Sequence, residues 1–233
     1  MKPLEQFYDD FVDYWIQNPR PSVREAYLGL LGDVRGQRVI DIGCGCGLDI
    51  KELSKRGAHG TGLDFSKKSI QQAQKLIGTD EKWNFVCTDF LSYHPQEQYD
   101  IALFSMIVMH YPDLSVVFKH IASMLKEHGR LLLVTNNPYL VCADYHLPYP
   151  KENESLPYMH RFEYEGNEMT VEKYLHAFSG YVNRASENGL LVASVQELAI
   201  YTEETRFFNP VQHPSIPNFL TFLFIKDTIN GYL

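Results

Sequence analysis

The sequence lacks three features that would each assign it to a particular class of protein. No apolar run approaches the roughly 20 residues of a membrane-spanning helix, so no membrane span is expected. Positive charge is not in excess, because 21 lysines and arginines stand against 29 aspartates and glutamates, and the net charge of −8 argues against nucleic-acid binding. Internal repeats and low-complexity segments are also missing, which argues against a repeat architecture.

Cysteine is scarce, with four residues in 233, and these four do not form the pattern of a disulfide framework. Cys44 and Cys46 could bind a soft metal ion, but no second pair of cysteines or histidines follows at ligand spacing, so no metal site is expected. The first ten residues lack the apolar core of a signal peptide. These observations together predict a cytoplasmic protein.

Short apolar segments alternate with helical segments between residues 38 and 135. The expected strands are 38–42, 59–63, 83–87, 99–104 and 130–135, and the expected helices between them are 47–56, 66–77 and 113–126. This alternation predicts an α/β fold with a mostly parallel sheet and helices on both of its faces. Two further helices, 4–17 and 22–31, are expected to form an N-terminal helical lid over residues 1–32.

The alternation stops after Thr135. Residues 136–169 are rich in asparagine, proline, tyrosine and histidine, and the segment is too long to be a plain connection. It is predicted to be a cap insertion with a short hairpin around residues 164–167. Thr170 is predicted to begin a helix that runs to Asn188, followed by a strand at 190–197 and a closing antiparallel strand at 218–225. The whole chain, 1–233, is expected to form one domain.

The most informative local pattern is a glycine turn after the first strand. Val39–Ile42 is followed by Gly43, Gly45 and Gly47, a spacing that lets the backbone bend sharply and approach a ligand without an intervening Cβ. Dinucleotide-binding proteins use Gly-x-Gly-x-x-Gly, and here the sixth position is Leu48. The spacing therefore disfavours a nucleotide-dependent oxidoreductase, which remains the second interpretation.

With Asp41 in the strand before it, this turn resembles the first motif of class I S-adenosylmethionine (SAM) methyltransferases, in which the glycines lie under the methionine part of the cofactor. Asp64, at the end of the second strand, resembles the family's acid that binds the ribose hydroxyls. Asp89 resembles the acid that binds the adenine amino group, and in the family the next residue flanks the base. As alternatives, Asp64 could be an acid at a helix N-terminus and Asp89 a turn residue.

The resemblance continues toward the C-terminus. Ser105 and Met106 stand where residues beside the sulfonium of the cofactor are found in the family. The segment 216–220, Ile-Pro-Asn-Phe-Leu, resembles the closing strand of small-molecule methyltransferases. One departure is that Met169-Thr170 stands where that subfamily usually has His-Arg.

The resemblance implies a Rossmann-like, seven-stranded sheet and SAM as the cofactor. It further implies transfer of a methyl group to oxygen or nitrogen of a small-molecule or peptide-like acceptor, with no nucleic-acid or membrane partner. The residues expected to bind the cofactor are Tyr14, Asp41, Gly43, Cys44, Gly45, Gly47, Asp64, Phe65, Asp89, Phe90, Ser105 and Met106.

No catalytic residue is identified from the sequence. His110, His146 and His160 are candidates for a general base, although His110 could equally pack between a helix and the sheet. Among the many aromatic residues, Tyr14 is the preferred contributor to a lid, with Tyr8 and Trp15 beside it on the same helix. A third interpretation is a SAM-binding module without turnover.

Overall fold

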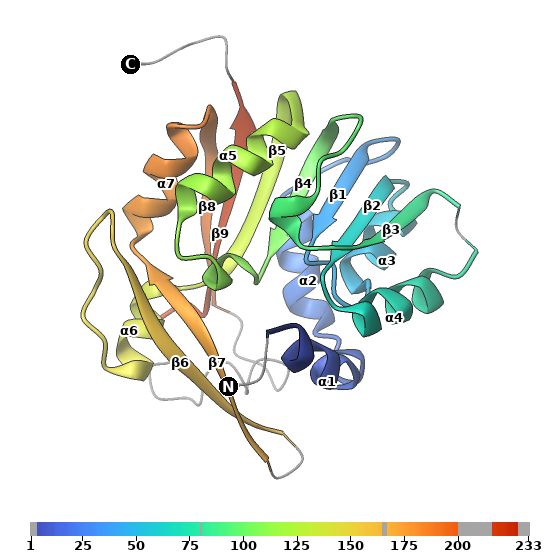
Figure 1. Cartoon of the computed structure of the whole chain (residues 1–233). Helices are drawn as coiled ribbons and strands as arrows, with labels where there is room; N and C mark the ends of the chain where they lie inside the picture. The colour runs from blue at the N-terminus through green and yellow to red at the C-terminus, as the bar shows by residue number, and fades with distance from the viewer. Residues whose placement is uncertain (1–3, 80, 165–166, 200–215, 228–233) are drawn as a thin grey trace.

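A computed structural model describes residues 4–79, 81–164, 167–199 and 216–227 (Figure 1). At its centre is a seven-stranded sheet with the strand order β3-β2-β1-β4-β5-β9-β8. The first five strands are parallel, and β9 is antiparallel to both β5 and β8, so β9 lies inside the sheet and β8 forms its edge. The strands are β1 (Arg38–Ile42), β2 (His59–Asp64), β3 (Trp83–Cys87), β4 (Tyr99–Ser105), β5 (Leu125–Asn136), β8 (Leu190–Leu198) and β9 (Phe219–Lys226).

Helices cover both faces of this sheet, which confirms the predicted fold class. The helices are α1 (Leu4–Gln17), α2 (Pro21–Gly29), α3 (Leu48–Lys55), α4 (Lys67–Ile77), α5 (Leu114–Met124), α6 (Pro138–Tyr145) and α7 (Phe178–Ser186), with short 3₁₀ turns η1 (Phe90–Ser92) and η2 (Val108–His110). None of the helices in the described part of the chain has the length and apolar character needed to span a bilayer.

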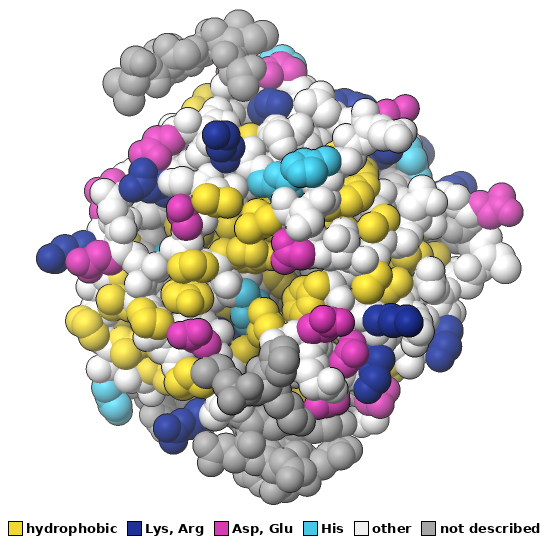
Figure 2. All heavy atoms as spheres, in the orientation of Figure 1, with side chains coloured by type: hydrophobic (Ala, Val, Ile, Leu, Met, Phe, Trp, Pro, Cys, Tyr) yellow, Lys and Arg dark blue, Asp and Glu magenta, His cyan; other side chains and the backbone are white. Residues whose placement is uncertain are grey.

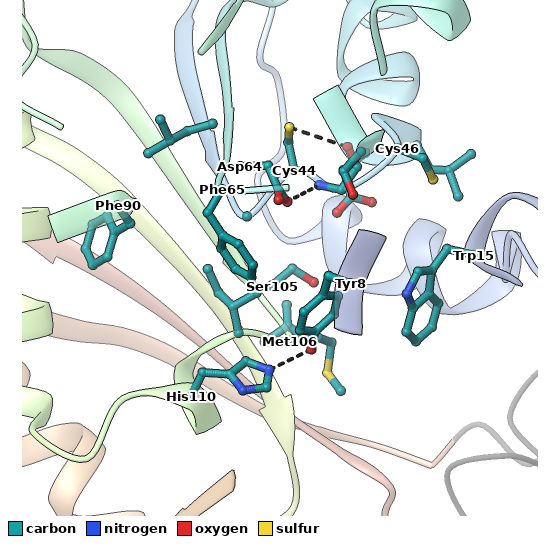
Figure 3. A pocket seen from close by; sticks show the side chains of 18 of the residues that line it. Tyr8, Trp15, Cys44, Cys46, Asp64, Phe65, Phe90, Ser105, Met106 and His110 are labelled. Carbon is teal, nitrogen blue, oxygen red and sulfur yellow. Dashed lines mark hydrogen bonds between the residues drawn. The ribbon is translucent and has the colours of Figure 1, made fainter. Parts of the chain in front are cut away.

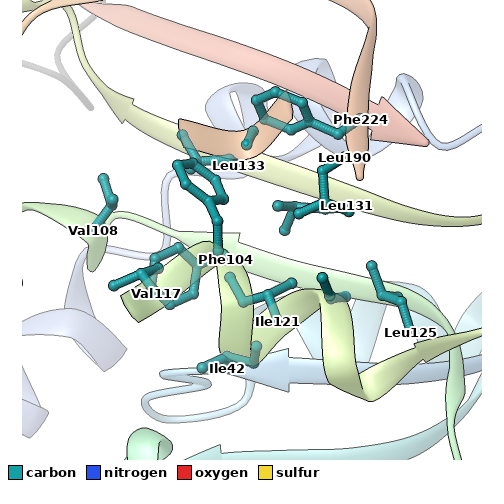
Figure 4. Packing of buried hydrophobic residues seen from close by; sticks show 14 of the residues in the cluster. Ile42, Phe104, Val108, Val117, Ile121, Leu125, Leu131, Leu133, Leu190 and Phe224 are labelled. Atoms are coloured by element: carbon teal, nitrogen blue, oxygen red, sulfur yellow. The ribbon is translucent and has the colours of Figure 1, made fainter. Parts of the chain in front are cut away.

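Alternate residues of the central strands supply two separate apolar cores. In β4, Ala102 and Phe104 point to the α5 and α7 side, while Ile101 and Leu103 point to the side of α2, α3 and α4. Both faces of a parallel strand are therefore buried, which explains why these strands read as continuous apolar runs. Figure 4 shows Phe104 among side chains of α5, β5 and β9. Complete burial of such a side chain stabilises the fold by roughly 1.5–3 kcal/mol.

A separate two-stranded antiparallel sheet follows α6 and is made by β6 (Ser155–Tyr164) and β7 (Asn167–His176). The predicted helix from Thr170 to Asn188 is therefore wrong in its first half, because β7 continues to His176 and α7 begins only at Phe178. Residues 171, 174, 175 and 178 are apolar or aromatic and match a helical period, but Val171 and Leu175 also match a strand period. Pairing with β6 at every position selects the strand.

The N-terminal helix α1 is attached to the start of α4. Ser66 Oγ donates a hydrogen bond to Asp9 Oδ1 at 2.5 Å, and the backbone N–H of Lys68 donates to the same oxygen at 3.2 Å. A negative charge is favoured at this position because the helix dipole is positive at its N-terminus. Asp9 therefore holds α1 against the sheet domain near the end of β2.

In the orientation of Figure 2, apolar side chains gather over the middle of the visible face, with acidic side chains among them. The lysine and arginine side chains visible there are scattered and form no continuous basic patch.

Candidate functional site

A cavity of about 560 Å³ opens where the parallel strands β1, β2, β3 and β4 end. Most of its wall comes from the ends of these strands and the residues that follow them, and from helices α1, α2 and α3. Single residues of other elements complete it, among them Lys173 of β7. In open α/β sheets, ligands bind at the carboxyl ends of the strands, where the strand order reverses. In this chain the reversal lies between β1 and β4, directly at the cavity.

The glycine turn forms part of the cavity wall. Gly45 has a positive φ of 53°, and a Cβ built on it would meet no atom within 4 Å, so this position faces open space. A Cβ on Gly43 would lie 2.7 Å from Ile107, so Gly43 is required for packing of the turn against the end of β4. Gly47 does not line the cavity; a Cβ there would lie 2.9 Å from that of Ala73 in α4. Cys44 lines the cavity and is buried.

Asp64 is fixed at the floor of the cavity by backbone donors (Figure 3). The N–H of Gly45 donates to Oδ2 at 2.9 Å, and the N–H of Ser66 donates to Oδ1 at 2.8 Å. Burial raises the pKa of this carboxyl to about 6, and the two backbone hydrogen bonds oppose the increase. Since each carboxylate oxygen can accept two hydrogen bonds, both oxygens retain acceptor capacity.

The residues expected after β2, β3 and β4 all line the same cavity. Phe65 follows Asp64, and Asp89 is exposed and accepts a hydrogen bond from the N–H of Leu91 at 2.8 Å, which caps η1. Phe90 is buried, with its ring centroid 5.5 Å from that of Phe104. Ser105, the last residue of β4, and Met106, which follows it, also line the cavity.

Met106 has a φ of 59°, a conformation that side-chain-bearing residues seldom adopt. Its N–H donates to the carbonyl of Val134 at 2.8 Å, which holds this backbone in the cavity wall. Strained backbone of this kind concentrates at functional sites.

Two more of the residues predicted to bind the cofactor are buried and do not line the cavity. Asp41 is 1% exposed and does not line the cavity, and burial together with the charges of Asp49 and Asp64 raises the pKa of its carboxyl well above the usual range. Tyr14 is 6% exposed, packs against Phe11, and accepts a hydrogen bond from Arg20 Nη2 at 3.2 Å.

Two adjacent faces of α1 have different surroundings, and Tyr14 lies on the buried one. Phe7, Phe11 and Tyr14 follow the helical spacing and pack with Val171 of β7. Tyr8 and Trp15, seven positions apart, form the adjacent face and line the cavity. A single helix therefore supplies aromatic residues to both the core and the cavity. Only the packing of α1 against the rest of the protein decides which residues point in which direction.

Of the three candidate histidines, His110 lines the cavity. Its Nε2 lies 2.7 Å from the hydroxyl of Tyr8, and burial together with the nearby charge of Lys173 lowers its pKa to about 3. His160 is outside the cavity lining and forms a hydrogen bond through Nδ1 with the Tyr145 hydroxyl. His146 is exposed, has a left-handed conformation at the end of α6, and also lies outside the lining.

Sequence reasoning missed several cavity residues. Arg24 Nε donates to Asp49 Oδ1 at 2.5 Å, and the Tyr27 hydroxyl donates to the same oxygen at 2.6 Å. These residues come from α2 and α3, and no local pattern connects them. Lys173 was missed because its segment was interpreted as a helix, whereas in a strand its inward position between Val171 and Leu175 would have been recognisable.

Comparison with known proteins gives a consistent result. Residues 14–214 match the family model described as a methyltransferase domain. The ubiquinone biosynthesis O-methyltransferase of Bradyrhizobium diazoefficiens is 37% identical over 105 residues, which cover 44% of this chain and 41% of that protein. The protein of the same name from Coxiella burnetii is 30% identical over 145 residues, which cover 58% of this chain and 61% of that protein. The chain thus spans about half the length of the curated relatives it matches.

Solved structures share the fold at lower sequence identity. An S-adenosylmethionine-dependent methyltransferase from Mesorhizobium loti is 21% identical with a TM-score of 0.65, and the match covers 87% of this chain and 97% of that one. A DhpI–SAM–HEP complex is 19% identical with a TM-score of 0.69, and the match covers 95% of both chains. These similarities establish the arrangement of the sheet and its helices.

Proposed function

Because this chain belongs to the methyltransferase-domain family, we propose that it binds SAM and transfers a methyl group to an oxygen or nitrogen atom of a small-molecule acceptor. The observation that carries the proposal is the fixed carboxylate of Asp64 beside Gly45, at the floor of a cavity at the strand ends. The choice of cofactor is supported by the similar DhpI structure, which is a complex with SAM.

The cavity residues fit such a cofactor. The oxygens of Asp64 can each accept one more hydrogen bond, which suits the two hydroxyls of a ribose. Asp89 and Phe90 offer a carboxylate and an aromatic ring to the adenine, and the open space at Gly45 leaves room for the methionine part. Tyr8, Trp15 and Phe65 place aromatic rings in the same cavity, and an aromatic face attracts a sulfonium by about 0.5–2 kcal/mol.

When bound, SAM supplies a methyl group that is already activated by its positively charged sulfur. The chain's own residues then orient the acceptor and exclude water. Helix α1 contributes to both tasks because Tyr8 and Trp15 form one wall of the cavity. Alignment of two reactants in this way contributes roughly 7–11 kcal/mol to lowering the barrier.

Two observations weigh against a nucleotide-dependent oxidoreductase. Leu48 lines the cavity at the position where a dinucleotide fingerprint requires glycine, and Gly47 is occupied in packing against α4. An oxygen acceptor is favoured by the names of the curated relatives, which are O-methyltransferases.

Calorimetric titration tests the proposal. The protein should release or absorb heat with SAM and with S-adenosylhomocysteine, and should give none with NAD as the control. Incubation of isotope-labelled SAM with a panel of phenols, carboxylic acids and amines should then give a labelled methyl product. Heat with NAD alone would overturn the proposal, and SAM binding without transfer to any panel member would favour a binding module.

A further inference from the structure

Lys173 occupies a position in β7 that an apolar residue would be expected to fill. It lies between Val171 and Leu175 on the inward face of the strand, and all three side chains are buried. Lys173 is 6% exposed, and its side chain lines the cavity. Lysine is almost never fully buried unless it is paired, so this position needs an explanation.

No counter-charge accompanies this amine. Within the residues that the structure describes, Lys173 forms no hydrogen bond or ion pair, and desolvation by burial lowers the pKa of its amine to about 7. The titratable groups around it are His110 of η2, Tyr8 of α1, and Tyr158 and His160 of β6. All four are uncharged near neutrality, because burial lowers the pKa of both histidines to about 3 and raises that of both tyrosines.

The two histidines are poorly suited to removing a proton from a substrate. His110 engages the Tyr8 hydroxyl through Nε2, and His160 engages Tyr145 through Nδ1 outside the cavity lining. Their lowered pKa values also make them weak bases. A buried amine that titrates near neutral pH has the basicity that a general base requires.

We propose that the methyl acceptor is a phenol and that the amine of Lys173 removes the proton of its hydroxyl. This inference rests on the proposed methyl transfer. The neutral amine nitrogen forms a new N–H bond with its lone pair, the acceptor O–H bond breaks, and the electron pair remains on the phenolate oxygen beside the new ammonium. That pair forms the bond to the methyl group while the bond from this methyl group to the sulfur of SAM breaks. The sulfur keeps the electron pair of the broken bond and leaves as S-adenosylhomocysteine, the other product is an uncharged ether, and the ammonium returns its proton to solvent.

The chemistry of the cavity selects a phenol among possible acceptors. An aliphatic hydroxyl is too weakly acidic for an amine that titrates near pH 7, and a carboxylic acid is already ionised and needs no base. A cationic amine acceptor would be repelled by protonated Lys173. A phenol, with a pKa of about 10 in water, can ionise when a positive charge forms beside it in a buried site. The rings of Tyr8 and Tyr111 in the cavity wall suit a planar aromatic molecule.

The test uses 4-nitrophenol, whose absorption spectrum distinguishes the phenol from the phenolate without any methyl transfer. Its ionisation should be followed against pH in the presence of saturating S-adenosylhomocysteine and excess protein. Wild-type protein should lower the apparent pKa of the bound probe by about one unit or more, a tenfold change in ionisation. Lys173→Met should abolish that shift, and Lys151→Met, which replaces an exposed lysine outside the cavity, should leave it unchanged.

Methyl transfer to an active phenol provides the second readout. In Lys173→Met, kcat should fall by about 10²–10⁴-fold, the usual contribution of a general base. Lys173→Arg, which keeps the positive charge but cannot accept a proton, should retain the spectral shift. Wild-type activity should decline as pH falls through about 7, since protonated Lys173 cannot take up another proton.

The outcomes separate this inference from the proposed function. Wild-type protein that binds S-adenosylhomocysteine but leaves the probe spectrum unchanged, or Lys173→Met with unaltered kcat, would overturn the role of Lys173 alone. Equal heats of S-adenosylhomocysteine binding in wild-type and Lys173→Met establish that the variant is folded. Wild-type protein that binds no SAM or S-adenosylhomocysteine would instead contradict the proposed function.

Discussion

The hydroxyl of Tyr8 lies 2.7 Å from Nε2 of His110, and this hydrogen bond joins residues 102 positions apart in the chain. Tyr8 belongs to the N-terminal helix and His110 follows the fourth strand of the central sheet. Their rings also meet edge to face, with centroids 5.5 Å apart, and the Tyr8 ring contacts Phe65 in the same way at 5.7 Å. One side chain of α1 thus contacts the loops after both β2 and β4.

Tyr8→Phe should destabilise the protein by about 1–3 kcal/mol, because it leaves the half-buried Nε2 of His110 without its partner. Urea unfolding measures this loss as a decrease in the free energy of unfolding. Tyr174→Phe is the matched control, since within the described residues the Tyr174 hydroxyl has no hydrogen bond. Equal stability of the two variants would mean that the Tyr8–His110 contact contributes nothing to closing α1 over the cavity.

Asp64→Ala should weaken SAM binding by roughly 1.5–3 kcal/mol, the usual value of hydrogen bonds to a charged group. Calorimetry gives this difference directly, and Asp13→Ala, at an exposed position of α1, serves as the control. An unchanged dissociation constant in a folded Asp64→Ala protein would remove Asp64 from the binding site.

The raised pKa of Asp64 predicts how SAM affinity depends on pH. The pKa of its carboxyl is about 6 in the folded protein and about 3.9 in the unfolded chain. The folded protein without cofactor therefore binds this proton more tightly, so the group stabilises the fold fully below about pH 4 and loses that contribution as pH rises through about 6. The cofactor requires the opposite state, because a protonated carboxyl loses an acceptor for the ribose hydroxyls. SAM affinity should therefore fall as pH decreases through about 6, and Asp64→Asn should lose this dependence. A pH profile that is the same in both proteins would contradict the assignment.

Gly45→Val tests the position of the cofactor over the glycine turn. The substitution places a side chain in the open space of the cavity and strains a backbone at φ 53°. Gly32→Val is matched to it, because Gly32 has a φ of 63° and also has no atom within 4 Å of an added Cβ, but it lies outside the cavity lining. Both variants should lose stability, and Gly45→Val alone should lose SAM binding. Normal SAM binding by Gly45→Val would refute the placement.

The sequence was sufficient to predict the central sheet and the edge at which the cavity opens. Val39–Ile42 and residues 99–104 read as apolar runs because both of their faces are buried, and parallel strands bring their carboxyl ends together. Gly45, Asp64, Asp89 and Ser105 are far apart in the chain, yet their positions at strand ends were enough to predict that they meet.

What the sequence could not supply depends on tertiary packing. The apolar residues from 171 to 178 satisfy two periods at once, and only pairing with β6 selects the strand. Tyr8, Tyr14 and Trp15 are all aromatic residues of one helix, and the sequence alone does not distinguish them. The contact of α1 with β7 decides which of them reach the cavity. The inward position of Lys173 could not be predicted until its segment was known to be a strand.

The most direct test is a crystal structure of the protein with S-adenosylhomocysteine. The proposed function predicts the adenosine in the cavity at the ends of β1, β2 and β4, with the ribose hydroxyls bonded to Asp64 and the amino-acid part over Gly45. A cavity that stays empty at saturating ligand concentration, or that takes up a dinucleotide in preference, would contradict it.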